Sequence, residues 1–189
     1  MGRLILVLGG ARSGKSDYAQ QLAESLGSAP VYVATAQAHD EEMIRRISVH
    51  RASRAERWET IEAPLGVAQA VKASCGSGDV YLLDCLTLLV SNVMMELGEK
   101  PSEKDVEQTL QMEVNALIDL VRSGEAVWIV VSNEVGLGIV PAYASGRLYR
   151  DVLGRANQKI AAAADVVVFM VSGLPMVIKG DIQHGKSAE

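Results

Sequence analysis

The sequence predicts an α/β fold: a mostly parallel β-sheet with helices packed on both of its faces. Apolar runs of strand length alternate with segments of helical periodicity along the whole chain, as in parallel sheets whose strands are joined by helices. In addition, the first apolar run, residues 4–8, leads straight into residues 9–16, which match the phosphate-binding pattern G-x-x-x-x-G-K-[ST]. We therefore expect a single nucleotide-binding catalytic domain over residues 1–180 and a C-terminal tail over residues 181–189.

The composition limits the possible functions. With 189 residues, of which 49% are hydrophobic, the chain can bury the core of one domain. Its net charge of −5 argues against nucleic acids or anionic membranes as partners, because both are bound through basic surfaces. No apolar run reaches the length of about 18 residues that a membrane-spanning helix requires, and the N-terminus lacks the pattern of a signal peptide. Cys75 and Cys85 are too few for a disulfide framework, so we expect a cytoplasmic protein in which both are small core residues.

Residues 9–16 are expected to form the phosphate-binding loop, or P-loop, between the first strand and the first helix. The glycines let backbone amides point toward a polyphosphate, and the following helix adds its positive N-terminal end. Lys15 is expected to reach the β- and γ-phosphates as a catalytic residue, and the Ser16 hydroxyl to bind Mg²⁺. The expected nucleotide contacts in this loop are Gly9, Gly10, Ala11, Arg12, Ser13, Gly14, Lys15 and Ser16.

The next two elements extend the expected nucleotide site. Apolar residues recur at helical spacing over residues 17–26, and Gly27 is a suitable terminator. The short apolar run 31–34 then predicts a buried strand. It ends at Thr35, where open α/β sheets place ligand-contacting loops; a helix N-cap is the alternative role for this threonine.

Residues 40–54 have the pattern of an amphipathic helix, charged on one side and apolar on the other. The charged side is unusually basic for an acidic chain. It belongs to an Arg/His cluster made up of Arg45, Arg46, His50, Arg51, Arg54 and Arg57. From composition alone, a solvated helix face paired with neighbouring glutamates explains this cluster better than a binding site does.

A candidate metal ligand follows near the middle of the chain. Residues 58–62 alternate as in a short strand, and a helix is expected to begin at Ala63-Pro64, with Pro64 near its first turn. The apolar run 79–84 then predicts a strand that ends in Asp84. A carboxylate at a strand end is common, but in a chain with a P-loop we expect it to hold Mg²⁺.

The second half of the chain continues the alternation of helices and strands. Residues 86–97 are apolar on more than one face, so we expect this helix to be buried in the domain or against another subunit. The apolar run 126–132 is typical of a strand in a parallel sheet, and the irregular loop 133–141 after it is expected to face the ligand. The other expected elements are helices over 106–121 and 147–164 and strands over 166–171 and 176–179, with a turn at 172–175.

The tail contains a second match to the phosphate-binding pattern, at residues 180–187. Only Ala188 and Glu189 follow, so no helix can supply the amides that the motif needs. We interpret this second match as fortuitous.

In a parallel sheet, the features that suggest chemistry share one edge, at the carboxyl ends of the strands. They are the P-loop, Thr35, Asp84 and the loop 133–141. Taken alone they favour a P-loop kinase, which leaves the Arg/His cluster unexplained.

Several stretches of the chain are more specific than a generic P-loop. They are Gly9-Gly10-Ala11-Arg12-Ser13-Gly14-Lys15-Ser16, Ala34-Thr35-Ala36, Asp40, Glu42-Met43, Arg46-Ile47, His50-Arg51, Arg54, Trp58, Thr60, Glu62, residues 133–141, Gly154-Arg155-Ala156-Asn157-Gln158, residues 161–165 and Val171-Ser172-Gly173. Together they resemble the bifunctional adenosylcobinamide kinase / adenosylcobinamide-phosphate guanylyltransferase family of cobalamin synthesis, over nearly the whole chain. The resemblance implies a RecA-like P-loop NTPase fold.

The resemblance also implies two reactions in one active site. In the first, ATP or GTP phosphorylates the side-chain hydroxyl of adenosylcobinamide, the corrinoid substrate. In the second, GMP from GTP is joined to that phosphate through a GMP-histidine intermediate, which gives adenosylcobinamide-GDP and pyrophosphate. The family's histidine falls on His50, and a neutral imidazole nitrogen is a good nucleophile near neutral pH. His39 and His184 lie outside that motif.

The GTP contacts of the family carry over to four further parts of the chain. Outside the P-loop they fall on Ala34, Thr35, Ala36, Arg51, Ala52, Ser53, Arg54, Glu62 and Asp84. We expect Mg²⁺ as the cofactor and GTP and ATP as substrates, and the resemblance implies a homotrimer. Two alternatives stay open: a P-loop kinase with a single activity, and a non-catalytic binding module controlled by GTP.

Overall fold

The computed structural model describes residues 1–37, 45, 58–74 and 78–182. The helix predicted over residues 40–54 lies outside the described residues except for Arg45, and so do His50, residues 51–54 and Cys75.

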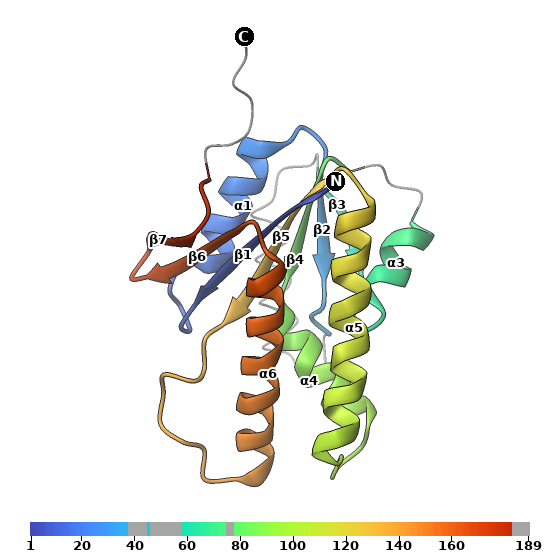
Figure 1. The fold of residues 1–189 in the computed structure, drawn as a ribbon, viewed down its shortest axis with the longest axis vertical. Helices are drawn as coiled ribbons and strands as arrows, with labels where there is room; N and C mark the ends of the chain where they lie inside the picture. The colour runs from blue at the N-terminus through green and yellow to red at the C-terminus, as the bar shows by residue number, and fades with distance from the viewer. Residues whose placement is uncertain (38–44, 46–57, 75–77, 183–189) are drawn as a thin grey trace.

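A seven-stranded sheet forms the centre of the molecule (Figure 1). Its strands are β1 (Arg3–Gly9), β2 (Pro30–Ala34), β3 (Glu59–Glu62), β4 (Val80–Asp84), β5 (Val127–Asn133), β6 (Val166–Val171) and β7 (Leu174–Lys179). They lie in the order β3-β2-β4-β5-β1-β6-β7, with β1 to β6 paired in parallel and β7 antiparallel to β6. The predicted mostly parallel sheet is confirmed, and β5 separates the P-loop strand β1 from the strand β4.

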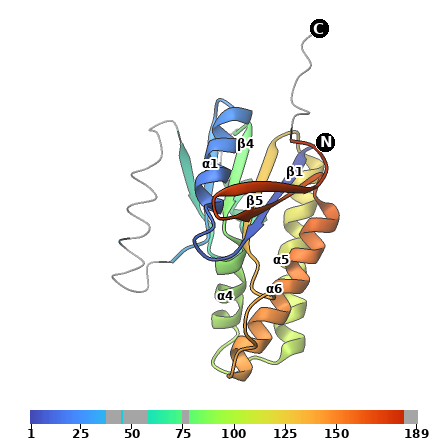
Figure 2. The same ribbon diagram turned by 90° about the vertical axis from the view of Figure 1, so that its left-hand side faces the viewer.

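Helices cover both faces of this sheet, as the sequence predicts. They are α1 (Lys15–Leu26), α3 (Val67–Ala73), α4 (Leu86–Glu96), α5 (Glu103–Ser123) and α6 (Ala144–Ala163). Figure 2 shows α1 on one face and α5 and α6 on the other. The alternation of side chains along β1 accounts for the two layers, because Ile5 and Val7 belong to the apolar cluster that includes α1. Leu4, Leu6 and Leu8 belong to the cluster that includes α3 to α6.

The apolar helix predicted at residues 86–97 is α4, and the domain itself buries most of it. Leu86, Leu89, Val90 and Val93 are at most 1% exposed. On the C-terminal side, Met95 is 55% exposed and Leu97 37% exposed. Burial within one chain therefore explains most of the apolar surface of this helix.

The start of α3 differs from the prediction. Pro64 was expected near the first turn, but the helix begins at Val67. Gly66, just before it, has a φ of 62°, a left-handed conformation that interrupts helical geometry. The N–H of Gly66 donates to Glu113 Oε1 at 2.8 Å, so a contact with α5 determines where α3 starts.

The hairpin at the end of the sheet also differs from the prediction. The turn was expected over residues 172–175, but β7 already begins at Leu174. Ser172 and Gly173 have φ values of 52° and 83°, as in a two-residue type I′ turn. This short turn leads directly from β6 into β7. Pro175 is tolerated in this strand because β7 is at the edge of the sheet.

Two smaller findings concern α6 and Cys85. Helix α6 begins at Ala144, before the predicted start at Arg147, and the Arg147 guanidinium donates to the carbonyls of Pro141 and Ala142 just outside the helix.

Cys85, expected to be a small core residue, is partly buried. Among the described residues, no helix combines the length and apolarity needed to span a membrane.

Candidate active site

The predicted site residues that the structure describes gather at the carboxyl ends of the parallel strands. The last residues of β1, β2, β3 and β4 are, in that order, Gly9, Ala34, Glu62 and Asp84. Thr35 and Ala36 follow β2, and Lys15 and Ser16 begin α1. His50 and residues 51–54, for which the resemblance implies roles, lie outside the described residues.

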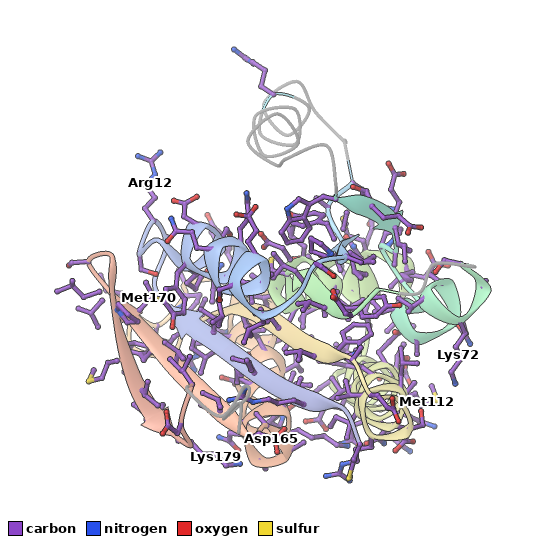
Figure 3. All side chains as sticks on the ribbon, turned by 90° about the horizontal axis from the view of Figure 1, so that it is seen from above. Arg12, Lys72, Met112, Asp165, Met170 and Lys179 are labelled. Carbon is purple, nitrogen blue, oxygen red and sulfur yellow. The ribbon has the colours of Figure 1, made fainter. Side chains whose placement is uncertain are left out.

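The backbone of the P-loop requires glycine at two positions. Gly14, which precedes α1, has a φ of 87°. Gly9 has a φ of 157°, and a Cβ at this position would lie 2.6 Å from Ser13 Oγ and 2.7 Å from the Met170 carbonyl oxygen. The start of the loop at Gly9 is therefore packed closely against Met170 of β6. Arg12 is exposed, and its side chain points away from the molecule (Figure 3).

Two polar groups of the P-loop are buried in a way that fits an anionic ligand. Ser13 is 8% exposed, and its Oγ has no hydrogen-bond partner among the described residues. Lys15 is also 8% exposed, and its Nζ donates to the Gly10 carbonyl at 2.6 Å. Burial lowers the pKa of Lys15 and outweighs the opposing effects of Cys85 and Asp84. Bound phosphate would give the Ser13 hydroxyl an acceptor and would favour the charged form of Lys15.

Ser16 and Asp84 are suitable ligands for Mg²⁺. One is a hydroxyl in the first turn of α1 and the other a carboxylate at the end of β4. Oxygen ligands of this kind suit Mg²⁺, which proteins usually bind through one or two side chains together with substrate phosphates and water. The described residues contain no group of three or more His, Cys, Asp or Glu side chains that would hold a metal by themselves. These two oxygen donors fit Mg²⁺ that substrate phosphates and water also bind.

Thr35 joins the end of β2 to the end of β4. It is fully buried, and its Oγ1 donates to the Cys85 carbonyl at 2.8 Å and accepts from the Cys85 N–H at 2.8 Å. Its own N–H donates to the Asp84 carbonyl at 3.4 Å, and the peptide bond between Asp84 and Cys85 is cis. These contacts fix the backbone on both sides of Cys85, next to the carboxylate of Asp84.

The Cys85 thiol is not available as a nucleophile at neutral pH. Burial, and then the neighbouring Asp84, raise its pKa to about 12. The thiol is thus protonated under physiological conditions, and its role at this edge is packing.

The loop after β5 is tied to the P-loop by a backbone hydrogen bond. The N–H of Glu134 donates to the Gly9 carbonyl at 3.0 Å. The N–H of Asn133 donates to Thr87 Oγ1 at 2.9 Å, and its carbonyl accepts from Asn157 Nδ2 at 3.0 Å. Helices α4 and α6 therefore both hold the start of this loop in place.

The turn between β6 and β7 supports the P-loop from the opposite side. The N–H of Gly173 donates to the Ser13 carbonyl at 3.0 Å. A Cβ at Gly14 would lie 3.4 Å from the Gly173 Cα, so the two backbones are in close contact. The P-loop is thus held between the loop after β5 and the β6–β7 turn.

Sequence reasoning missed a set of buried polar side chains beneath this edge. They are Thr87 and Asn92 on α4 and Asn157 on α6. Each bonds to backbone at or near the strand ends. The available signal was the presence of Thr87 and Asn92 in a helix that is otherwise mostly apolar.

Comparisons with known proteins identify the family of this chain. A family model described as cobinamide kinase / cobinamide phosphate guanyltransferase matches residues 5–178. The bifunctional adenosylcobalamin biosynthesis protein CobP of Pseudomonas aeruginosa is 44% identical over 176 residues, which cover 93% of this chain and 97% of that protein. The bifunctional adenosylcobalamin biosynthesis proteins CobU of Escherichia coli and Salmonella typhimurium are 41% and 40% identical, over 93% of this chain and 99% of each relative. The resemblance seen in the sequence motifs is confirmed, and the chain belongs to the cobinamide kinase / cobinamide phosphate guanyltransferase family.

Proposed function

We propose that this chain is a bifunctional enzyme of cobalamin biosynthesis, with adenosylcobinamide kinase and adenosylcobinamide-phosphate guanylyltransferase activities. The observation that carries the proposal is the family match over residues 5–178. The P-loop geometry is consistent with it, since the buried Ser13 hydroxyl and the buried Lys15 lie where phosphates would bind.

In the kinase step, the P-loop would hold the triphosphate of ATP or GTP while the corrinoid hydroxyl attacks the γ-phosphorus. The new O–P bond forms as the bond to the β-phosphate oxygen breaks, the nucleoside diphosphate leaves with the bonding electrons, and the hydroxyl proton passes to water. Lys15 would donate hydrogen bonds to the β- and γ-phosphate oxygens, where negative charge develops. Mg²⁺, held by Ser16 and Asp84 together with phosphate oxygens, would supply further neutralisation of that charge.

In the guanylyl-transfer step, the His50 imidazole would attack the α-phosphorus of GTP. An N–P bond forms, the bond to the β-phosphate breaks, and pyrophosphate leaves while the P-loop holds its oxygens. The phosphate of adenosylcobinamide phosphate then attacks the same phosphorus, which releases His50 and forms adenosylcobinamide-GDP. The arginines among residues 51–54 would offset the charge of the reacting phosphates.

This division of roles is tested with Lys15→Ala, His50→Ala and a control, His39→Ala, a histidine outside the family motif. We expect Lys15→Ala to lower both activities by about 100-fold or more, because both use the P-loop phosphates. His50→Ala should lower guanylylation by at least about 100-fold and change phosphorylation less than about threefold. His39→Ala should change neither activity by more than about threefold.

The covalent step has its own readout. After incubation with α-³²P-GTP and denaturation, label should stay on the wild-type protein and on His39→Ala, be labile to acid and stable to base, and be absent from His50→Ala. Phosphorylation without label or guanylylation would identify a kinase with one activity. GTP binding without corrinoid-dependent turnover would identify a binding module. Guanylylation that survives in His50→Ala would disprove the role of this histidine.

We further propose that the protein acts in the cytoplasm as a homotrimer, with a corrinoid and nucleotides as its partners. Apolar side chains on β7 that would otherwise face solvent support a subunit contact: Leu174, Met176, Val177 and Ile178 are 71%, 51%, 43% and 59% exposed. Light scattering of the purified protein should give three times the mass of the 20.2 kDa chain. A monomer mass at micromolar concentration would contradict the trimer.

A further inference from the structure

Gly154 lies inside helix α6, a place where glycine is unfavourable. Glycine loses more backbone freedom in a helix than alanine does, so a glycine in a helix interior calls for a reason. Gly146, the other glycine of α6, has one, because a Cβ there would lie 2.9 Å from the Pro141 Cβ. A Cβ at Gly154 would meet no other part of the described chain within 4 Å. Packing within the chain therefore explains Gly146 but not Gly154.

Gly154 opens onto a hollow beside α6. The hollow has a volume of about 460 Å³, and its walls come from the end of β1, the loop after β5 and one side of α6. That loop, residues 134–143, runs beside α6 from the end of β5 to the start of the helix (Figure 1). The volume lies in the range of sites that bind small molecules. A ligand in this hollow would use the space that the missing side chain leaves.

The hollow borders the P-loop. Leu8, which lines it, precedes Gly9, and the N–H of Glu134, which also lines it, donates to the Gly9 carbonyl at 3.0 Å. The expected GTP contacts that the structure describes outside the P-loop lie at or just after the ends of β2, β3 and β4, and none of them lines the hollow. The hollow is therefore open to a second substrate next to the phosphates.

The charges on the wall of the hollow balance. Its charged side chains among the described residues are two acids, Glu134 and Asp151, and two bases, Arg150 and Arg155. Arg150 Nη2 lies 3.0 Å from Asp151 Oδ1, so these two charges already offset each other. A polyphosphate is bound through an excess of basic groups, which this wall lacks. Carboxylates and guanidinium groups together suit a neutral ligand that both donates and accepts hydrogen bonds, such as a primary carboxamide.

The loop after β5 adds apolar side chains that the chain leaves uncovered. Gly136 lines the hollow, and Leu137 follows it directly. Leu137, Ile139 and Val140 are 82%, 97% and 60% exposed. Exposed apolar side chains that gather in one loop mark a contact surface. Together with the balanced polar wall, they suit a ligand whose apolar ring system is edged by carboxamides, which describes a corrinoid.

We propose that this hollow binds the corrinoid, with Gly154 leaving room for its carboxamide-bearing edge and Leu137 and Ile139 in contact with the apolar ring. The inference rests on the proposed function and deepens it, because it gives the second substrate a site beside the P-loop. Adenosylcobinamide and its phosphate share the same macrocycle, so one site serves both reactions. From this site the hydroxyl side chain would reach the P-loop phosphates past Glu134.

The test fills the hollow from its α6 side with Gly154→Met. The matched control is Ala162→Met, which places the same side chain on the same helix at an exposed position that does not line the hollow. Gly154→Ala is a smaller filling. The measurements are KM for adenosylcobinamide and for ATP in phosphorylation, Kd for adenosylcobinamide by equilibrium dialysis, the mass by light scattering and the urea midpoint.

For Gly154→Met we expect KM and Kd for adenosylcobinamide to rise about tenfold or more, because the added side chain overfills the site. KM for ATP should change less than about threefold, and the mass should equal that of the wild type. The urea midpoint should be at or above the wild-type value, since methionine and alanine are better helix formers than glycine. Gly154→Ala should raise KM for the corrinoid less than Gly154→Met does, and Ala162→Met should leave it within about twofold.

Two results would overturn the inference while the proposed function stands. One is a KM for the corrinoid in Gly154→Met and Gly154→Ala equal to that in Ala162→Met. The other is a lower mass in Gly154→Met than in the wild type, which would assign the hollow to a contact between subunits. If the wild-type protein does not phosphorylate adenosylcobinamide, the proposed function fails. Dialysis then decides the inference by itself, which fails if the wild type does not bind the corrinoid or if Gly154→Met binds it equally well.

Discussion

Replacement of Thr35 by valine tests the join between β2 and β4. Thr35 is 0% exposed, and valine has nearly the same shape, so the substitution removes the Oγ1 hydrogen bonds and leaves the packing intact. The Cys85 N–H and carbonyl, each 2.8 Å from Oγ1, lose this partner. The Cys85 carbonyl keeps the Leu89 N–H at 3.2 Å, so only the Cys85 N–H is left without this partner. One unpaired buried polar group costs about 1–3 kcal/mol, so we expect the free energy of unfolding to fall by about 1–3 kcal/mol.

The measurement is urea unfolding followed by circular dichroism, with an unchanged slope m and a lower midpoint. Thr60→Val is the matched control, because Thr60 is an exposed residue of the edge strand β3, and it should shift the free energy of unfolding by less than about 0.5 kcal/mol. Thr35→Ser, which keeps the hydroxyl and loses a methyl group, should cost about 1 kcal/mol. A loss below about 0.5 kcal/mol in Thr35→Val would refute the energetic role assigned to these two hydrogen bonds.

Two further predictions concern ionisable groups. Partial burial disfavours the charge on Asp79, but hydrogen bonds from Ser28 and Ala29 outweigh it and lower its pKa. A carboxyl group with a lowered pKa in the folded state stabilises above its unfolded pKa, so Asp79→Ala should cost about 1 kcal/mol at pH 7. In urea titrations that difference should begin to decrease as the pH falls below about 4, the unfolded pKa, and should disappear only below the lowered pKa of the folded state. The Cys85 thiol, with its pKa raised to about 12 by burial and Asp84, should react with iodoacetamide at pH 8 at least about 100-fold more slowly than in urea-unfolded protein, as read by peptide mass spectrometry. Equal rates would show that this thiol is open to solvent.

The parts of the fold that sequence reasoning predicted are those with strong local patterns. The apolar periodicity of α5 and the uninterrupted apolar run of β5 identify these elements within a few residues. The start of α3 could not be predicted in the same way, because Gly66 takes its left-handed conformation next to a contact with Glu113, 47 residues away in the chain. Such long-range contacts leave no periodic signal.

In the candidate site, too, some residues could be predicted from the sequence and others could not. The P-loop and Asp84 were readable because one is a contiguous motif and the other ends an apolar strand. The roles of Asn92 and Asn157 were not, since each reaches across to backbone of other elements. A buried asparagine in an apolar helix indicates only that its amide has some hydrogen-bond partner. Its partners, here the carbonyls of Thr35 and Pro64, become known only when the topology brings β2, α3 and α4 together.

The contact between the Gly173 N–H and the Ser13 carbonyl has a consequence for the order in which the protein is made. The P-loop is encoded near the start of the chain, but one of its supports is encoded 160 residues later. In addition, β1 pairs with β5 and β6, both from the second half of the chain. A nascent chain that emerges N-terminus first therefore carries its nucleotide motif for most of synthesis without the neighbours that shape it. Competence to bind nucleotide should arise late, once the C-terminal hairpin has left the ribosome.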